Sequence, residues 1–485
     1  MIRISENALK TVNLIRQQTG GNPDIIIKQT SIYDKDLFVV FSESLSDRII
    51  INDYILEYIE ELKLKQDGVP DLFKYLSQNI PTHKVIKIDN YKDLYYNLLS
   101  GFTIVMVDGY KEVLSIETKA KLDSGVQDAK SEQIIKGPKD AFTENYQTNI
   151  GLIRKRIKSK DLWLEELIVG NKSKTKVGIM YVKDIASKKL VDEIVEKIKK
   201  IDIDGIFDSN YIIEMISENK KNVFANYLST ERPDNASIHL MDGRIAIVVE
   251  NTQYVVIIPA MFVDFFHSTE DYYQKVTNVN LTRMIRTIAF FITLLTPAIY
   301  VAISTYNLEA IPAKLLISFS TQREGVPLPT IIEIMAMTIT FELLRETDAK
   351  TPSAIGSSLS IVGALVLGQA AVAAGIVSPI TIIVVSITAI SGLIVYSVDM
   401  VNGIRWWRLI FLVFAALAGI YGILIASLIF IINVSSIKSF GIPFLTPFAP
   451  FYKREQHNAF FLTNKRKFSK RNHLTAKDNY ERQAK

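Results

Sequence analysis

Two carboxylates in an otherwise apolar stretch are the side chains of this sequence whose setting best suits chemistry. Residues 328–346 carry Glu333 and Glu342 among mostly apolar residues. An ionisable group at membrane depth is costly, so it usually faces a protein interior, a water-filled cavity or an ion. At about 100° per residue, the two carboxylates lie on different faces of a helix. They are therefore candidates for an ion path.

The neighbours of the two carboxylates differ. Glu342 shares its helix face with Thr338 and can pair with Arg345 three residues later. Glu333 has no basic residue within one turn, so it requires a neighbouring helix, a cation or water. We take Glu333, Glu342 and Thr338 as the candidate ion path. The alternative is a helix that lies in the membrane interface, with its charges in headgroup water.

A stripe of small residues follows this acidic helix. Its members recur at spacings of three or four and so share one helical face: Ser357, Ser360, Ala364, Gly368, Ala371 and Gly375. Small residues let helix backbones approach closely in lipid, which predicts a helix interface. Identical helices of several subunits could meet there around a pore. Ordinary packing inside one subunit is the alternative.

Signatures of enzymes and of metal or cofactor sites are missing from the sequence. There is no cysteine, and the five histidines lie far apart without metal-site spacing. Neither a phosphate-binding loop nor a dinucleotide-binding glycine pattern occurs. We therefore expect no catalytic residues, no metal and no cofactor.

Long uncharged segments predict a helical membrane domain. Residues 287–308, flanked by Arg283 and Arg286, are long enough to cross a bilayer, and three more spans are expected near 353–377, 379–398 and 409–434. The acidic helix at 328–346 is ambiguous, either a crossing or an interfacial element. The run Arg405-Trp406-Trp407-Arg408 is expected to anchor the last span at the interface.

The segment before the spans has the pattern of an α/β protein in two subdomains. Strand-like apolar runs at 25–28, 37–41, 85–88 and 103–107 alternate with helical patterns in the first subdomain, residues 1–130. The second subdomain, residues 131–280, is expected to contain strands at 177–182 and 201–203, a helix capped by Ser187 and a hairpin around Asn251. A polar linker at 118–138 joins the two.

Charge and hydropathy predict the topology. Residues 1–31 lack the apolar run of a secretory signal, so the α/β domain is expected in the cytoplasm. The tail, residues 453–485, holds ten Lys or Arg against three Asp or Glu, and the rest of the chain carries about −2. A basic tail after spans is typical of the cytoplasmic side and of contact with anionic lipid, and it argues against nucleic-acid binding. The fold class is thus a cytoplasmic α/β domain followed by an all-α transmembrane bundle, residues 281–452, with an even number of crossings, preferably four.

Several short strings carry a family resemblance in addition to these patterns. They occur in one order between residues 132 and 452: Lys136-Gly137-Pro138, Thr230-Glu231-Arg232-Pro233-Asp234, Pro259-Ala260-Met261-Phe262-Val263-Asp264, Arg323-Glu324-Gly325-Val326-Pro327 and Gly375-Ile376-Val377-Ser378-Pro379. In this order they resemble the GerA family of spore germination proteins, and in particular the A subunits of germinant receptors. Gln253 departs from the family pattern, where proline is expected.

The resemblance implies a multi-pass subunit of a nutrient receptor in the inner membrane of the spore. Its implied partners are a permease-like B subunit, a lipoprotein C subunit, membrane lipid and further A subunits, whose oligomer would form an ion conduit. Two alternatives remain. One is a component of a secondary transporter, in which Glu333 or Glu342 binds a coupling cation. The other is a paralogue of the stage V sporulation protein AF type.

Overall fold

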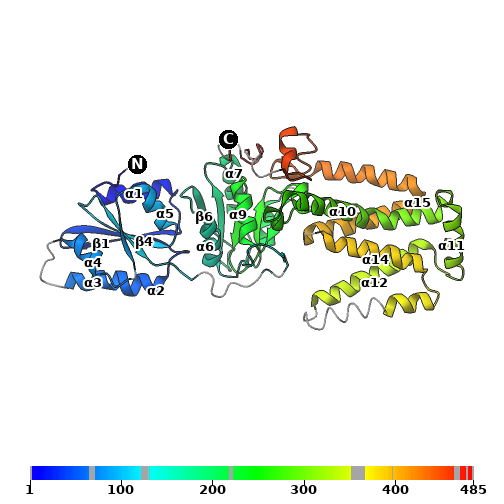
Figure 1. The fold of residues 1–485 in the computed structure, drawn as a ribbon, viewed down its shortest axis with the longest axis horizontal. Helices are drawn as coiled ribbons and strands as arrows, with labels where there is room; N and C mark the ends of the chain where they lie inside the picture. The colour runs from blue at the N-terminus through cyan, green and yellow to red at the C-terminus, as the bar shows by residue number, and fades with distance from the viewer. Residues whose placement is uncertain are drawn as a thin grey trace. The chain divides into compact units, whose positions relative to one another are not determined.

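The chain forms two compact units. A computed structural model describes residues 3–64, 71–82, 84–121, 129, 131–217, 222–350, 366–395, 397–463, 470–476 and 479–482. The α/β unit comprises Met1–Lys220, Tyr227–Ala260 and Lys465–Lys485, and the helical unit comprises Lys221–Asn226 and Met261–Asn464. Figure 1 follows the chain through both.

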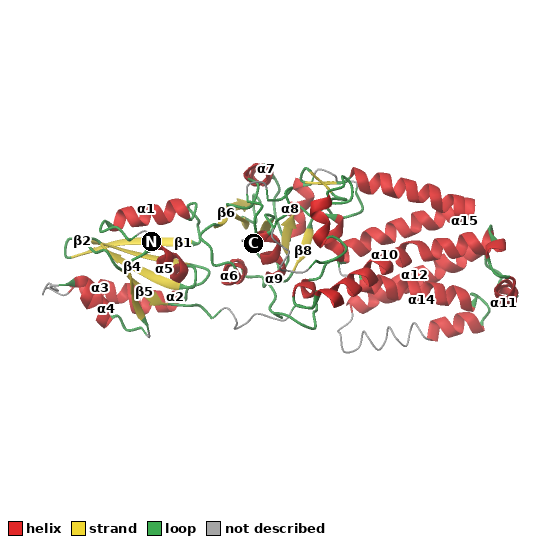
Figure 2. Ribbon diagram, turned by 45° about the horizontal axis from the view of Figure 1, so that its top comes forward, coloured by secondary structure: helices red, strands yellow, loops and turns green. Residues whose placement is uncertain are grey.

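The α/β unit begins with a five-stranded antiparallel sheet between two layers of helices. The strands run in the order β1-β2-β4-β5-β3, with bounds Ile25–Ile32, Lys35–Ser42, Phe102–Val107, Val113–Glu117 and Val85–Ile88. Alternate residues of β2 point to opposite faces, so Phe38 packs with α1 and α5 while Val39 packs with α2, α3 and α4. Figure 2 shows these helices on the two sides of the sheet. The helices are Ala8–Gln18, Arg48–Ile51, Glu57–Leu64, Leu72–Asn79 and Tyr91–Leu98, with a π-helical turn at Asn52–Leu56.

A second five-stranded antiparallel sheet completes the α/β unit. Its order is β6-β7-β9-β10-β8, with bounds Leu162–Val169, Thr175–Val182, Ile245–Val249, Val255–Ile258 and Leu228–Thr230. Its helices are α6 (Tyr146–Arg156), α7 (Lys188–Lys199), α8 (Ser209–Ile216) and α9 (Pro233–Met241). The expected hairpin is confirmed, with Asn251 at φ 66° in its turn. The strand expected at 201–203 is wrong, because these residues form a loop whose Ile203 carbonyl accepts from the Asn171 N–H.

The end of the expected linker is bound to the second sheet. The described residues of 118–138 contain no helix, but Glu132 accepts a hydrogen bond from the Thr230 hydroxyl. The backbone N–H groups of Ser131 and Glu132 donate to the Glu231 carboxylate. Burial is the main cause that raises the pKa of the Glu132 carboxyl to about 7; the charge of Glu231 also raises this pKa, and the Thr230 hydrogen bond lowers it. The linker end is therefore part of the fold.

This buried carboxyl makes the stability of the α/β unit depend on pH. The folded state favours protonated Glu132, so its contribution is complete below the ordinary pKa of about 4.5 and is lost as the pH rises through about 7. We expect a fragment of residues 1–260 to lose up to about 3 kcal/mol of unfolding free energy over this range. Urea unfolding followed by Trp163 fluorescence measures it. Glu132→Gln should flatten the profile, and an unchanged slope would contradict the assignment.

The basic tail also binds to the α/β unit. Arg471 is buried, and its Nε donates to the Met241 carbonyl at the end of α9 at 3.0 Å. The Thr475 hydroxyl donates to the Asp242 carbonyl at 2.7 Å, and Arg482 lies 3.1 Å from the Asp242 carboxylate. These tail residues therefore contact protein, whereas the sequence predicts that the tail contacts lipid.

The described residues of the helical unit form two helices long and apolar enough to cross a membrane. They are α10 (Val276–Thr305) and α15 (Val398–Ser436), and α14 (Pro379–Ile394) is a shorter apolar helix. The unit also has α11 (Ala313–Arg323), α12 (Thr330–Lys350) and a helix at 366–373. Two short strands, β11 (Lys438–Ser439) and β12 (Ile442–Pro443), follow α15.

Helix α15 is a hairpin, whereas the sequence predicts one continuous span over 409–434. Ala418 and Gly419 leave the helical conformation, with Gly419 at φ 59°. The rings of Trp407 and Phe430 lie 5.0 Å apart, which a straight helix would not allow for residues so distant in sequence. The halves approach so closely that a Cβ at Gly422 would overlap the Phe414 carbonyl oxygen. The sequence does not reveal this reversal, because the residues on both sides of the turn are equally apolar.

The start of α10 is fixed by a buried ion-pair cluster. Asp271 accepts from Arg283 Nε at 2.8 Å and from Arg286 Nη1 at 3.0 Å. Arg283 is fully buried and also donates to the Asn458 side chain and the Ala459 carbonyl. The sequence treats both arginines as free flanking charges. The structure instead uses them to join α10 to the segment that follows α15.

Candidate functional site

Glu333 lies buried at the junction of α12, α14 and α10. One oxygen, Oε2, accepts hydrogen bonds from the Ser378 backbone N–H and the Thr381 hydroxyl, both at 2.9 Å. Ser378 is the N-cap of α14, so the carboxylate sits at the positive end of that helix. This partner from another helix meets one of the requirements inferred from the sequence. The alternative in which Glu333 lies in headgroup water does not fit, because its side chain has no exposed surface.

The second oxygen of Glu333 is the unusual atom of the site. Oε1 is buried and makes no hydrogen bond within the described part of the chain. Its nearest charge is the Arg323 guanidinium from α11, at 3.8 Å. That distance exceeds a hydrogen bond. This carboxylate oxygen can accept a hydrogen bond from water or from a shifted Arg323 side chain, or it can coordinate a cation. Arg323 was missed as a partner because it lies ten residues before Glu333, outside the range of helical pairing.

Hydroxyl groups surround this carboxylate. The Ser378 and Thr381 hydroxyls lie 2.9 Å apart, and the Tyr300 hydroxyl of α10 lies 3.5 Å from that of Thr381. On the other side, Ser304 donates to the Thr330 hydroxyl at 3.4 Å. Apolar side chains, including Ile334 and Ile380, pack around the group. The Ser378 and Thr381 hydroxyls beside a buried carboxylate are oxygen groups of the kind that a partly dehydrated monovalent cation or a water binds.

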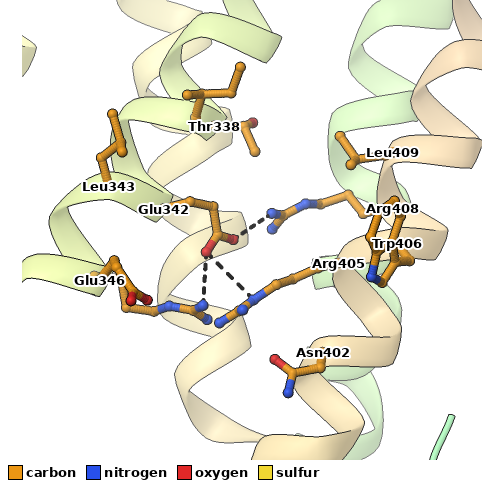
Figure 3. A pocket seen from close by; sticks show the side chains of 11 residues that line it. Thr338, Glu342, Leu343, Glu346, Asn402, Arg405, Trp406, Arg408 and Leu409 are labelled. Atoms are coloured by element: carbon orange, nitrogen blue, oxygen red, sulfur yellow. Dashed lines mark hydrogen bonds and ion pairs between the residues drawn. The ribbon is translucent and has the colours of Figure 1, made fainter. Parts of the chain in front are cut away.

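Glu342 has entirely different surroundings. Its carboxylate lies 3.0 Å from Arg345 on the same helix, as expected, and 2.9 Å and 3.5 Å from Arg408 and Arg405 of α15. Figure 3 shows the carboxylate between these guanidinium groups. Thr338 lines the same pocket. Three arginines around one carboxylate disfavour a cation beside it.

The interfacial anchor expected at 405–408 is wrong for two of its members. Arg408 and Trp407 are buried, with 8% and 4% exposure, because they face α12 and the second half of α15. Trp406 is 63% exposed and keeps a position suited to lipid contact. The hairpin in α15 is the reason, since it surrounds this turn with protein.

The structure separates the two candidate carboxylates. They stand nine residues apart on α12, which corresponds to about 14 Å along the helix axis. Glu333 faces the start of α14, and Glu342 faces α15 together with Thr338. The three residues are therefore not one cluster.

Half of the small-residue stripe falls on described residues. Gly368 is buried, and a Cβ there would lie 3.8 Å from Ile382 of α14. Gly375 has φ 65° and lies beyond the last helical residue of 366–373, so it ends the helix instead of extending its face. Ala371 is half-buried. Ser357, Ser360 and Ala364 lie outside the described residues.

Gly368→Leu is expected to disable the membrane part of the protein. A leucine side chain is far longer than the space to Ile382 allows, so the two helices must separate. We expect a loss of nutrient-triggered germination with little effect on the α/β unit. Spore germination assays measure the first effect, and limited proteolysis of the α/β unit in the full-length variant chain measures the second. A mutant with normal assembly and a normal response would remove the stripe from the account.

The described residues offer no metal centre. Among them, no three His, Asp or Glu side chains converge in a way that could hold a metal ion. The candidate site contains two acids in different settings: Glu333 has one oxygen without a hydrogen bond in the described part of the chain, 3.8 Å from Arg323, and Glu342 is surrounded by guanidinium groups.

Comparison with known proteins adds an independent line of information. A family model described as Bacillus/Clostridium GerA spore germination protein matches residues 13–474. Spore germination protein KA of Bacillus subtilis (strain 168) is 35% identical over 463 residues, which cover 95% of this chain and 85% of that protein. The uncharacterized membrane protein YfkQ of the same organism is 32% identical over 459 residues, covering 94% and 89%. A crystal structure of the N-terminal domain of the A subunit of the Bacillus megaterium spore germinant receptor GerK3 is 33% identical in sequence, covers 54% of this chain and 98% of that chain, and has a TM-score of 0.43.

Proposed function

Because this chain belongs to the GerA family of Bacillus/Clostridium spore germination proteins, we propose that it is the A subunit of a nutrient receptor in the inner membrane of the spore. In this proposal, nutrient binding to the receptor starts germination, and the helical unit forms part of an oligomeric conduit for monovalent cations. The proposal assigns no catalytic role to the chain. Family membership over residues 13–474 carries the receptor part.

The conduit part rests on one observation, the buried Glu333 oxygen without a hydrogen bond. A carboxylate of this kind, among hydroxyl groups at the start of α14, supplies what a dehydrated cation needs. We keep Thr338 and Glu342 in the proposed ion path as lining residues at a second position along α12. The Glu342 cluster favours a role in gating, since its arginines repel cations.

We place both the α/β unit and the tail in the cytoplasm. The described part of the tail is bound to α9 of the α/β unit, so both lie on one side of any membrane and the number of crossings is even. Helices α10 and α15 have the length and composition for crossing. The hairpin of α15, the shorter α14 and the acidic α12 complete a multi-span bundle. Buried Glu333 favours α12 inside this bundle.

Single cysteines test this topology, since the native chain has none. Ser31→Cys, on an exposed position of β1, and Ser469→Cys, in the tail, should both stay unlabelled by an impermeant thiol reagent in intact cells. Both should react once the membrane is permeabilised. A cysteine at Leu308, in the short 3-10 helix Leu308–Ala310 that follows α10, serves as a control and should react in intact cells. Labelling of either test position before permeabilisation would contradict the assignment.

The partners proposed are a permease-like B subunit, a lipoprotein C subunit and further copies of this chain. The test is genetic. Deleting the gene should abolish the germination response to at least one nutrient, and the response should return with the wild-type gene. Co-purification with the products of adjacent B and C subunit genes separates a receptor from a paralogue or a lone transporter component. A deletion without effect on any nutrient response would overturn the proposal.

A further inference from the structure

A pocket between α12 and α15 contains more positive than negative charge. It has a volume of about 640 Å³ and is lined by residues of both helices. Arg345, Arg405 and Arg408 surround Glu342, and Figure 3 shows the side chains converging on the carboxylate. Glu346, the other acid of the lining, is 61% exposed and pairs with Lys350. One carboxylate therefore compensates three guanidinium groups.

Two of these arginines have donors left over. The Nε atom of Arg408 is buried and makes no hydrogen bond within the described part of the chain, and the buried Nε of Arg405 lies 3.5 Å from the Glu342 carboxylate without forming a hydrogen bond. The Arg408 side chain is only 9% exposed. A buried guanidinium without enough acceptors is costly, and the cost is removed by a bound anion. The fork of N–H groups on arginine matches the oxygens of phosphate.

The rest of the lining indicates the source of the anion. Leu343 and Trp406, at the edge of the pocket, are 64% and 63% exposed and offer apolar surface beside the charges. Gly403, two residues before Arg405, packs on Phe224. Phe224 belongs to Lys221–Asn226, a short segment of the helical unit that continues into the α/β unit at both of its ends. The pocket thus lies toward the side assigned to the cytoplasm.

We infer that this pocket binds the phosphate of an anionic phospholipid from the cytoplasmic leaflet. The inference rests on the proposed membrane location of the helical unit. Basic pockets between helices at this depth are suited to anionic headgroups, and the exposed apolar edge accommodates the first part of an acyl chain. The bound phosphate adds the acceptors that Arg405 and Arg408 lack and holds α12 against α15. Free inorganic phosphate has the same chemistry and is the other possible source.

The test uses the full chain extracted in detergent and transferred to nanodiscs of phosphatidylcholine, with or without phosphatidylglycerol. Native mass spectrometry after release counts the lipid that is retained. We expect retention of phosphatidylglycerol over phosphatidylcholine, and at least a tenfold weaker retention in Arg408→Gln and in Arg405→Gln. Arg408→Lys should fall between, because it keeps the charge and loses the fork. Lys438→Gln, which removes an exposed charge elsewhere in the unit, should bind as the wild type.

A separate arm titrates the lipid-free chain with inorganic phosphate. Binding there that is lost in the same variants supports the phosphate site and assigns it to the free anion. Equal lipid retention by wild type and both arginine variants, without phosphate binding, overturns the inference. Arg405 is 30% exposed, so its variant stays informative if Arg408→Gln fails to fold. Recovery of the chain without detergent would instead refute the membrane location, which separates the two failures.

Discussion

Glu333→Gln is expected to slow the release of monovalent cations from spores at least tenfold after nutrient addition, at a normal protein level. Glutamine keeps the shape and can still accept from the Ser378 N–H, and the Ser378 side chain that caps α14 is unchanged. The negative charge is lost, together with the attraction for a cation of the Glu333 oxygen that makes no hydrogen bond within the described residues. A charged hydrogen bond contributes about 1.5–3 kcal/mol, and about 1.4 kcal/mol corresponds to a factor of ten.

The control for this experiment is Glu346→Gln, the same change on the same helix. Glu346 is 61% exposed and pairs with Lys350, so its neutralisation should leave the release rate near that of the wild type. Potassium release measured by flame photometry or a selective electrode compares the two. A Glu333→Gln spore that releases cations at the wild-type rate would remove Glu333 from the ion path, while leaving the receptor assignment intact.

Asp271→Asn is expected to have the largest effect on stability. The carboxylate is the shared partner of Arg283 and Arg286, and Arg283 is fully buried. The variant leaves that guanidinium with neutral acceptors in place of a carboxylate, among them Asn458 and Ala459. Removing one partner of a buried pair costs about 3–5 kcal/mol. We therefore expect a clear fall in the thermal unfolding midpoint of the full chain in detergent, and less chain in the membrane.

The neighbouring Glu270 provides the matched control. Its carboxylate accepts from the Gln274 side chain, and it forms no ion pair with an arginine in the described part of the chain. Glu270→Gln should lower the unfolding midpoint by much less. Similar midpoints for Asp271→Asn and Glu270→Gln would show that the cluster does not hold the start of α10.

The local part of the fold was predictable because its signals are local. Continuous apolar runs identified β2 and β7, and the apolar residues after Ser187 identified α7, in which Leu190, Val191, Ile194, Val195 and Ile198 are buried. Ser187 occupies the N-cap position, although its side chain makes no capping hydrogen bond. Periodicity reports which face of an element is buried, so it places elements well. It does not report sheet order, which depends on long-range pairing.

The candidate site was predictable only in part. The cost of a buried acid singles out Glu333 and Glu342 in sequence, but their partners come from other elements. Arg323, Arg405 and Arg408 reach them only because α11 and the hairpin of α15 bring them close. The turn at Gly419 leaves no signal in an apolar segment, and without it Arg408 would seem to face the interface. A chain reversal inside a uniformly apolar segment is therefore not predictable from the sequence.

The central proposal is that this chain forms part of a conduit that releases cations when the receptor detects a nutrient. The most direct measurement reconstitutes the chain with its B and C partners in potassium-loaded vesicles and follows potassium efflux after a mixture of nutrients is added. The account predicts efflux that requires both the nutrients and this chain, and that falls at least tenfold with Glu333→Gln. Assembled complexes that bind nutrient but release no potassium would contradict it.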